Sequence, residues 1–404
     1  MNHTETDATG EESLVAGHSG HTSRPEQFLR GLAAIAALYL FIASVNMIGD
    51  GLKVIAKDDA GENFLHMLFG MIAENPVMGL FVGLLVTSLV QSSSFTTSMT
   101  VGLVATGDVS LTAAIPIVMG ANIGTSVTNI LVSLAHIRHR LEFRRSLAGA
   151  IVHDFFNVLS VLLIFPLEMA FGVISKPAGW ISDALGHVQY FSSDPNKQIG
   201  FLKTAFEAVG ALFHWLTIDV LHLSAQWAGS IIAVLAVVLL FVALWILVKM
   251  LHGMIQERLS GAFNRTLFRK PAIAFAVGIL LTAAVQSSSV TTSLVVPLIG
   301  AGILKLRQVY PYMLGANIGT TITAILAALG LGKAPAMACA MAHLLFNVYG
   351  TMVFWPLQFI PISLAKGFAK IASQRRLVAI GYILIVFFVI PILGIVLIEL
   401  WKRG

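Results

Sequence analysis

The sequence is poor in charged residues and has almost no cysteine. Only 11% of its 404 residues are Asp, Glu, Lys or Arg, whereas soluble domains carry about a quarter. Because 57% of the residues are hydrophobic, we expect the chain to lie in a lipid bilayer. The single cysteine, Cys339, has no partner within the chain, which excludes an intrachain disulfide and indicates a small packed side chain.

The first 30 residues lack an apolar segment of signal-peptide length. They are polar, and we predict that residues 1–30 form a disordered cytosolic tail. The net charge of +5 comes from Lys and Arg gathered in a few segments. Basic loops of membrane proteins mainly set orientation, so the sequence does not indicate a nucleic-acid partner.

An internal repeat organises the chain. The run Gln91-Ser92-Ser93-Ser94 recurs as Gln286-Ser287-Ser288-Ser289, and Gly-Ala-Asn-Ile-Gly-Thr occurs at 120–125 and again at 315–320. Both pairs are offset by 195 positions, and His153 and Asn157 match His343 and Asn347 at an offset of 190. Three matched blocks in one order indicate a duplicated unit.

Each unit contains a stretch with no charged residue that is too long for one membrane helix. Residues 75–107 contain no Asp, Glu, Lys or Arg, and as one helix at about 1.5 Å per residue they would exceed a hydrocarbon core of about 30 Å. We predict a re-entrant helical hairpin here and another over 271–304. Irregular backbone at membrane depth is tolerated only inside protein or beside water, so the two tips should meet centrally.

The predicted fold class is an all-α polytopic membrane protein with two inverted-topology repeats. Each repeat should contain one re-entrant hairpin and discontinuous helices, and one additional C-terminal membrane helix should follow. Orientation is predicted from three basic clusters, near 138–145, 249–270 and 366–376, which should lie inside with the N-terminus. The predicted domains are the tail 1–30, a first transport repeat 31–172, an extracytoplasmic loop 173–228, a second repeat 229–360, and a basic loop with a membrane helix 361–404.

The Gln-Ser-Ser-Ser runs are dense in small polar groups, which are costly in a membrane unless they are bonded. Such residues can join helices or contact a ligand, and the duplication of the cluster favours a ligand. A half-helix that begins at a serine turn offers unpaired N–H groups and the positive end of its dipole, which suits a tetrahedral anion such as phosphate. Neither hairpin contains Arg or Lys, so bound sodium should supply the compensating charge.

The Gly-Ala-Asn-Ile-Gly-Thr motifs offer neutral oxygens that a hard cation prefers. Two glycines permit a helix break, Asn offers a carbonyl oxygen and Thr a hydroxyl. Taken alone, a glycine-interrupted helix is more often a packing contact. The duplication beside the hairpins favours a sodium site.

Asp154 breaks the repeat, because its counterpart in the second half is Leu344. An acid within a membrane helix is a candidate cation ligand or proton carrier. The alternative is a structural partner of Arg144, Arg145 or His153. His153 and His343 themselves are expected to be satisfied by hydrogen bonds rather than to be functional.

These residues resemble those of a known family. The two Gln-Ser-Ser-Ser runs, the segment from Ile115 to Asn129, and Phe143-Arg144-Arg145 followed by Val152-His153-Asp154-Phe155-Phe156-Asn157 are similar to the type II sodium-phosphate cotransporters. The resemblance covers roughly residues 30–395. It implies sodium-driven phosphate uptake, with phosphate held between the two hairpin tips and sodium near the second motif. A channel is the other mode of transport, but inverted repeats with broken helices and a midplane site favour alternating access over an open pore.

The resemblance also implies site residues. The expected phosphate contacts, with the two motif asparagines added, are Gln91, Ser92, Ser93, Ser94, Ser287, Ser288, Ser289, Asn122 and Asn317. The expected sodium ligands are Gln286, Ser287, Thr320 and Thr323, to which Thr125 and Asp154 are added as candidates. The segment 173–228 has no cysteine, whereas vertebrate members carry a disulfide in that loop, so a bacterial member in the inner (plasma) membrane is expected.

Two other functions stay open from the sequence. The same hydroxyl cradle could carry sulfate or arsenate. An intramembrane serine hydrolase would need a serine paired with a base, and no Gly-x-Ser-x-Gly elbow is present, so the chain is not expected to be an enzyme. The expected partners are phosphate, co-transported sodium ions and the lipid bilayer, without an organic cofactor, and the chain is either a homodimer or a monomer.

Overall fold

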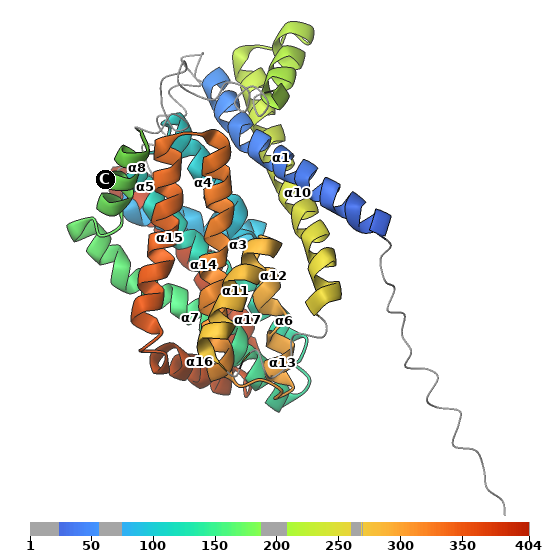
Figure 1. Ribbon diagram of the computed structural model, residues 1–404. Coiled ribbons are helices and arrows are strands. Elements are labelled where there is room, and N and C mark those ends of the chain that lie inside the picture. The colour runs from blue at the N-terminus through green and yellow to red at the C-terminus, as the bar shows by residue number, and fades with distance from the viewer. Residues whose placement is uncertain (1–23, 56–74, 187–207, 260–267, 269, 404) are drawn as a thin grey trace, which may run out of the picture.

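The computed structural model describes residues 24–55, 75–186, 208–259, 268 and 270–403. This part of the chain is helical and contains no strand (Figure 1). Seven segments within it are long and apolar enough to cross a membrane. They are Leu29–Ile48, Leu111–Leu134, Arg140–Phe171, Ala225–Ile246, Leu306–Leu331, Ala334–Phe354 and Leu377–Trp401. The predicted all-α polytopic class is therefore confirmed.

The first helices of the two predicted repeats pack against each other beside the main bundle. They are α1 (Arg24–Ile55) and α10 (Ala225–Leu259), and Figure 1 shows them side by side. A Cβ at Gly229 would lie 2.6 Å from the Ile55 backbone nitrogen, so this crossing requires a glycine. Helix α1 starts at Arg24, inside the range predicted as a tail, and residues 1–23 lie outside the described residues.

Both long uncharged stretches fold as pairs of helices that reverse at the glutamine of the Gln-Ser-Ser-Ser run. The first pair is α3 (Pro76–Val90) and α4 (Ser93–Thr106); the second is α11 (Pro271–Val285) and α12 (Ser288–Ser293), extended by α13 (Val296–Gly300). Helices α3 and α11 have 15 residues each. At about 1.5 Å per residue each is about 22 Å long, shorter than a hydrocarbon core of about 30 Å.

The helices that carry the Gly-Ala-Asn-Ile-Gly-Thr motifs differ between the halves. In the first half, α5 (Leu111–Gly124) and α6 (Ser126–Leu134) are separated by Thr125 alone, which keeps right-handed helical dihedrals. In the second half, α14 (Leu306–Leu331) runs through the motif without interruption. The expected helix break is therefore wrong for the second copy and amounts to one residue in the first.

The motif glycines instead allow helices to approach closely. A Cβ at Gly120 would collide with the carbonyl oxygen of Leu80 on α3, and a Cβ at Gly315 would collide with that of Phe275 on α11. At Gly319 the nearest backbone oxygen would be 2.6 Å away. Small residues four apart are typical of close helix contacts in membranes. The packing interpretation, left open from the sequence, is the one that the structure shows.

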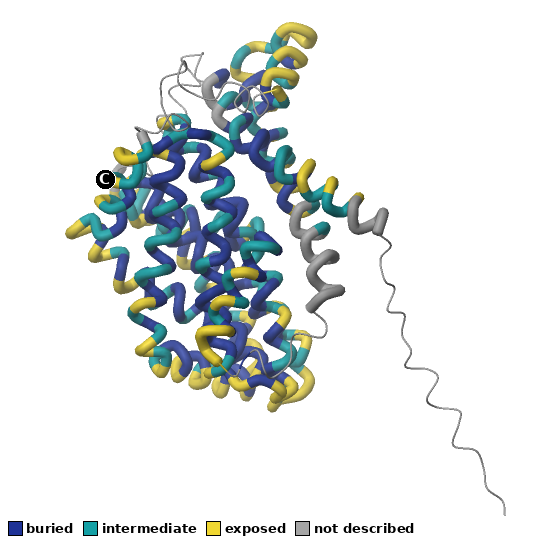
Figure 2. Tube along the Cα trace, viewed as in Figure 1, coloured by how far each residue is buried: buried dark blue, intermediate teal, exposed yellow. Residues whose placement is uncertain are grey.

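The remaining helices complete the bundle. They are α7 (Arg140–Phe171), α8 (Ser175–Gly186), α15 (Ala334–Phe354), α16 (Phe359–Ala372), α17 (Leu377–Leu384) and α18 (Ile390–Arg403). A π-helical segment, Ile385–Val389, joins α17 to α18. The segment predicted as a loop, 173–228, also contains a helix over Ala208–Val220. Buried residues fill the centre of the bundle, whereas exposed ones concentrate at its ends and outer surface (Figure 2).

Candidate functional site

Each hairpin tip is built on a glutamine in an unusual backbone conformation. Gln91 and Gln286 both have a φ of 58°. This value lies in the left-handed region, which residues other than glycine rarely adopt. The side chain then folds back, so that its Nε2 donates to the carbonyl three residues earlier. Its Oε1 accepts from a threonine of the second motif, Thr128 at 2.8 Å or Thr323 at 2.7 Å. The two tips are thus anchored in the same way.

The first two serines after each glutamine have different roles: the first caps a helix and the second has a free hydroxyl. Ser92 and Ser287 are N-caps, whose Oγ atoms accept the N–H of the residue three positions later at 3.2 and 3.3 Å. Ser93 and Ser288 follow and are only 5% and 3% exposed. Within the described part of the chain, no hydrogen bond involves either of their hydroxyls. Two hydroxyls at the tips are therefore available to donate to a ligand.

The third serine of each run reaches the other half of the molecule. Ser94 Oγ donates to the carbonyl oxygen of Gln286 at 3.0 Å and lies 3.4 Å from Thr323 Oγ1. Ser289 Oγ donates to the carbonyl oxygen of Thr125 at 3.5 Å. The two tips, far apart in the sequence, are therefore brought together and bonded to the opposite repeat.

A pair of threonines holds the two arms of each hairpin together, and sequence reasoning assigned no role to these four residues. Thr87 Oγ1 donates to Thr96 Oγ1 at 2.8 Å, and Thr282 and Thr291 share a hydrogen bond at 2.7 Å. All four side chains are buried. Their positions are related by the offset of 195, so the repeat itself could have identified them.

A group of neutral oxygens gathers at the second tip. It comprises the carbonyl and side-chain oxygens of Gln286 together with the hydroxyls of Thr323 and Ser94. Of the other predicted sodium ligands on this side, Ser287 follows Gln286, and Thr320 lies one turn before Thr323 with its hydroxyl bonded to the carbonyl of Ala316 at 3.0 Å. Neutral oxygens suit a hard monovalent cation. Among the described residues, no three His, Cys, Asp or Glu side chains gather as a transition metal would need.

The two motif asparagines bond to helix α7 rather than to the hairpins. Asn317 Oδ1 is hydrogen-bonded to His153 Nε2, and its Nδ2 donates to Asn157 Oδ1 at 2.8 Å. Asn157 Nδ2 donates in turn to the backbone oxygen of Asn122 at 2.8 Å, and Asn122 Nδ2 donates to Val118 O. Both asparagines are buried. The side-chain amide of Asn317 joins α14 to α7, whereas that of Asn122 bonds within its own helix and the link to α7 is made by its backbone oxygen.

The repeated histidines do not behave alike. His153 is hydrogen-bonded through Nε2, as expected. Neither ring nitrogen of His343 has a partner among the described residues, although the side chain is 1% exposed. The prediction that both histidines are satisfied by hydrogen bonds is therefore wrong for His343.

Asp154 is fully buried and bonds to a tyrosine outside both repeats. Tyr382, on α17, donates its hydroxyl to Asp154 Oδ2. The other carboxylate oxygen, Oδ1, is buried and makes no hydrogen bond of ordinary geometry in the described part of the chain, although the Ser126 hydroxyl lies beside the carboxylate. Arg144 and Arg145 are exposed and bond to no described carboxylate, so the ion pairs considered from the sequence do not form. Tyr382 belongs to no motif, and no sequence signal marked it.

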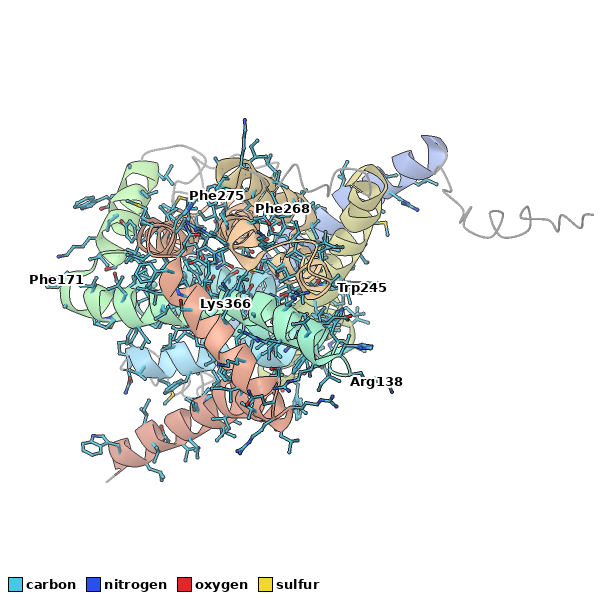
Figure 3. The ribbon with its side chains drawn as sticks, turned by 90° about the horizontal axis from the view of Figure 1, so that it is seen from below. Arg138, Phe171, Trp245, Phe268, Phe275 and Lys366 are labelled. Atoms are coloured by element: carbon cyan, nitrogen blue, oxygen red, sulfur yellow. The ribbon has the colours of Figure 1, made fainter. Side chains whose placement is uncertain are left out.

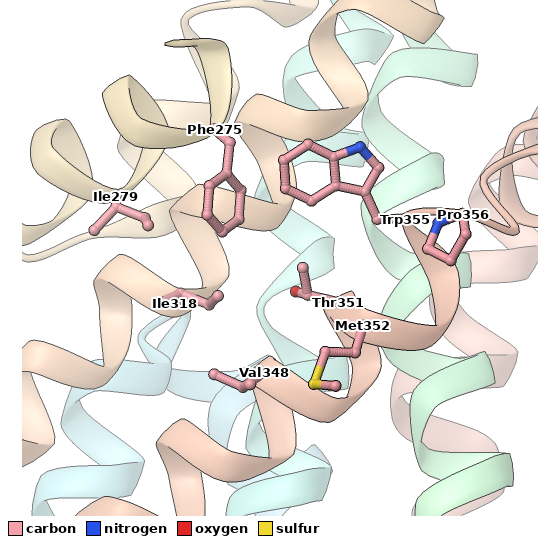
Figure 4. A pocket seen from close by; sticks show the side chains of 8 residues that line it. All are labelled: Phe275, Ile279, Ile318, Val348, Thr351, Met352, Trp355 and Pro356. Carbon is pink, nitrogen blue, oxygen red and sulfur yellow. The ribbon is translucent and has the colours of Figure 1, made fainter. Parts of the chain in front are cut away.

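A nearby pocket of about 550 Å³ does not suit an ion. It lies between α11, α14 and α15 (Figure 4). Its lining residues are largely apolar: Phe275, Ile279, Ile318, Val348, Thr351, Met352, Trp355 and Pro356. Because an inorganic ion loses its hydration without compensation in such surroundings, the hairpin tips remain the candidate site.

Comparison with known proteins places the chain among transporters. The family of Na+/Pi-cotransporters matches residues 40–174 and 239–399. Sodium-dependent phosphate transport protein 2A of Rattus norvegicus is 34% identical over 418 residues, which are 88% of this chain and 65% of that protein. Sodium-dependent phosphate transport protein 2B of Homo sapiens is 32% identical over 446 residues, 90% of this chain and 64% of that protein. The chain spans slightly less than two thirds of these relatives, and no solved structure gives a significant match.

Proposed function

The chain belongs to the family of Na+/Pi-cotransporters, and on that basis we propose that it imports inorganic phosphate together with sodium ions. The described part of the chain has seven apolar helices long enough to cross a bilayer, as expected of an integral membrane protein, and its relatives are named as sodium-dependent phosphate transport proteins. The observation that carries the proposal is the contact between Ser94 and Gln286, which brings the two serine-rich tips together.

Phosphate binds between the tips. Helix α4 begins at Ser93, so its first backbone N–H groups and the positive end of its dipole face the turn. The free hydroxyls of Ser93 and Ser288 donate to phosphate oxygens from opposite repeats. Gln91, Ser92, Ser94, Ser287 and Ser289 shape the turns and complete the contacts. Asn122 and Asn317 contribute by holding α5 and α14 to α7, Asn122 through its backbone oxygen and Asn317 through its side-chain amide.

Sodium binds to the neutral oxygens at the second tip. Gln286, Ser287, Thr320 and Thr323 supply carbonyl and hydroxyl oxygens, and Ser94 adds a hydroxyl from the first repeat. The cation compensates the charge of the phosphate, because neither hairpin contains Arg or Lys. Anion binding therefore depends on the cation. Thr125 lies in the corresponding region of the first repeat, where its carbonyl accepts from Ser289.

Asp154 forms an additional cation site. Its Oδ1 is buried and makes no hydrogen bond of ordinary geometry among the described residues, with only the neutral Ser126 hydroxyl beside the carboxylate. An uncompensated charge at this depth is costly unless a cation or proton neutralises it. Tyr382 orients the carboxylate through Oδ2. The ion that binds here is sodium.

Alternating access follows from the two halves. Residues 31–172 and 229–360 act as inverted transport repeats around the central site, and 361–404 supplies the basic segment and the last membrane helix. The basic residues of α7 and α16 lie at one end, which the positive-inside rule assigns to the cytosol together with the N-terminus. The segment 173–228 is then extracytoplasmic, in a bacterial inner membrane.

A transport assay tests the proposal. The purified chain is reconstituted in liposomes, and uptake of labelled phosphate is followed with an inward sodium gradient and with an equal potassium gradient. We expect uptake with sodium only, and we expect Ser93→Ala or Ser288→Ala to suppress it. Ser182→Ala, on α8, is the control that leaves uptake unchanged. Uptake without sodium would refute the coupling.

Competition separates phosphate from the other oxyanions. If sulfate or arsenate displaces labelled phosphate as effectively as unlabelled phosphate does, the tips form a general oxyanion site. The hydrolase alternative finds no support at His153, whose bonded nitrogen is engaged by Asn317 rather than by a serine. Uptake thus remains the activity to measure.

A further inference from the structure

A cationic cavity is lined by residues of α7, α13, α14 and α16. Figure 1 shows α13 and α16 at one end of the molecule, and Figure 3 views the molecule from that end. The volume of the cavity is about 710 Å³. Figure 3 shows Lys366 near the middle of this end. Five basic side chains line the cavity, and no acidic residue does; the basic residues are Arg144, Arg145, Lys305, Arg307 and Lys366.

The five cations come from three separate elements. Arg144 and Arg145 belong to α7, Lys305 and Arg307 flank the start of α14, and Lys366 is on α16. All five are exposed. In the part of the chain that the structure describes, none of them is paired with a carboxylate. Like charges around one cavity repel one another, so a bound anion would relieve a cost that the protein itself leaves uncompensated.

The Arg145 guanidinium lies against Gly302. A Cβ at Gly302 would lie 2.7 Å from Arg145 Nη1, and Gly302 has a φ of 74°. Gly107, the residue at the matched position of the first repeat, also has a positive φ, of 89°, yet a Cβ there would meet no atom within 4 Å. The turn therefore forms in both repeats, but only the second places a guanidinium against it.

Four of the five cations have uncharged residues at their matched positions, whereas Lys366 corresponds to Lys176 at the offset of 190. Arg144 and Arg145 correspond to Ala334 and Pro335, and Lys305 and Arg307 correspond to Ser110 and Thr112. The repeat fold consequently does not need those four cations. The positive-inside rule accounts for their side of the membrane, but not for their convergence on one cavity.

We propose that this cavity is a second anion site, which binds a phosphate group on the cytosolic side. Arginine guanidinium groups bind phosphate oxygens in pairs, and lysines add point charges. Apolar residues form the rest of the wall, and Leu141 among them is 57% exposed. A basic pocket with an apolar wall between membrane helices suits the headgroup of an anionic lipid. Free inorganic phosphate shares the same chemistry and is the other source.

A binding experiment tests the site without relying on transport, so that failure of the proposed function would leave the result interpretable. The purified full-length chain in neutral detergent is titrated with dioctanoyl phosphatidic acid, with dioctanoyl phosphatidylcholine or with inorganic phosphate, and bound molecules are counted by native mass spectrometry. Phosphatidic acid should bind and phosphatidylcholine should not. Displacement by inorganic phosphate identifies free phosphate as a ligand, whereas its failure to displace identifies the lipid.

Variants with matched charge decide where binding occurs. The triple change Arg144→Gln, Arg145→Gln and Lys305→Gln should weaken phosphatidic acid binding by about tenfold or more. The control removes three charges at the same end but outside the cavity: Lys370→Gln, Arg375→Gln and Arg376→Gln. It should leave binding unchanged. If the triple variant does not fold, the single change Arg145→Gln replaces it in the test. It should also weaken phosphatidic acid binding.

Two results would overturn the proposal. One is an equal loss in the cavity variant and in the control, which would mean that the charge of the whole face attracts the probe. The other is a wild-type chain that binds phosphatidic acid no better than phosphatidylcholine and binds as much inorganic phosphate as the cavity variant does.

Discussion

Substitution of Thr323 by valine tests the sodium site most directly, because valine keeps the shape and removes one hydroxyl. In the structure, that hydroxyl donates to Gln286 Oε1 at 2.7 Å and lies 3.4 Å from Ser94 Oγ. Gln286 is 5% exposed, so its oxygen would lose a partner at a cost of about 1–3 kcal/mol. The hydroxyl oxygen would also be lost to a bound cation.

The expected magnitude follows from the strength of such a contact. A hydrogen bond or contact to a charged group contributes about 1.5–3 kcal/mol, and about 1.4 kcal/mol corresponds to a factor of ten in affinity. Thr323→Val should therefore raise the sodium concentration for half-maximal effect by roughly ten- to hundredfold. Two assays measure it, the sodium dependence of phosphate uptake and the sodium-dependent rise in melting temperature of the purified protein.

The repeat supplies a matched control at Thr128. Its hydroxyl donates to Gln91 Oε1 at 2.8 Å, the same interaction at the first tip. Thr128→Val should therefore cost similar stability without sodium, but it should shift the sodium dependence less, because the sodium site is assigned to the second tip. Equal sodium shifts in the two variants, or no shift in Thr323→Val, would refute the assignment.

Further predictions concern the buried acid and the helix crossing. Asp154→Asn should reduce the charge moved with each phosphate and weaken sodium dependence, as electrophysiology on proteoliposomes and uptake assays would show; if both are unchanged, Asp154 is no cation ligand. Tyr382→Phe should have a smaller effect in the same direction, because the carboxylate stays but loses its orienting hydroxyl. Gly315→Ala should lower the free energy of unfolding by about 1–3 kcal/mol, measured by thermal unfolding against Gly367→Ala, where a Cβ meets no atom within 4 Å.

The sequence predicted the helical class and the place of the hairpin turns, because both depend on strong local signals. Long stretches without charged residues indicate segments that lie in the membrane, and a polar run within such a stretch indicates where the chain reverses. The contact between the tips was also expected, and in the structure it includes the hydrogen bond from Ser94 to the carbonyl oxygen of Gln286. The ligand assignments at the tips remain predictions.

The Gly-Ala-Asn-Ile-Gly-Thr motif shows why other features were not predictable. Glycine permits both a helix break and a close crossing, and the choice depends on which helix lies against it. At Gly315 that helix is α11, whose Phe275 carbonyl occupies the space of a Cβ. The neighbour comes from 40 positions earlier in the chain, so a local pattern could not identify it, and the break was expected where α14 is in fact continuous.

Identical residues at matched positions can also make different bonds, which limits what a repeat can show. His153 and His343 have the same relation to Asn157 and Asn347 in the sequence. Asn317 nevertheless bonds to His153 and Asn157, whereas both ring nitrogens of His343 and the Oδ1 of Asn347 lack partners among the described residues. The two halves therefore pack unequally around the site. Asp154 has no acidic counterpart in the second half, and Arg144, Arg145, Lys305 and Arg307 of the cationic cavity have uncharged counterparts. These departures from the repeat identify residues that the common fold does not require.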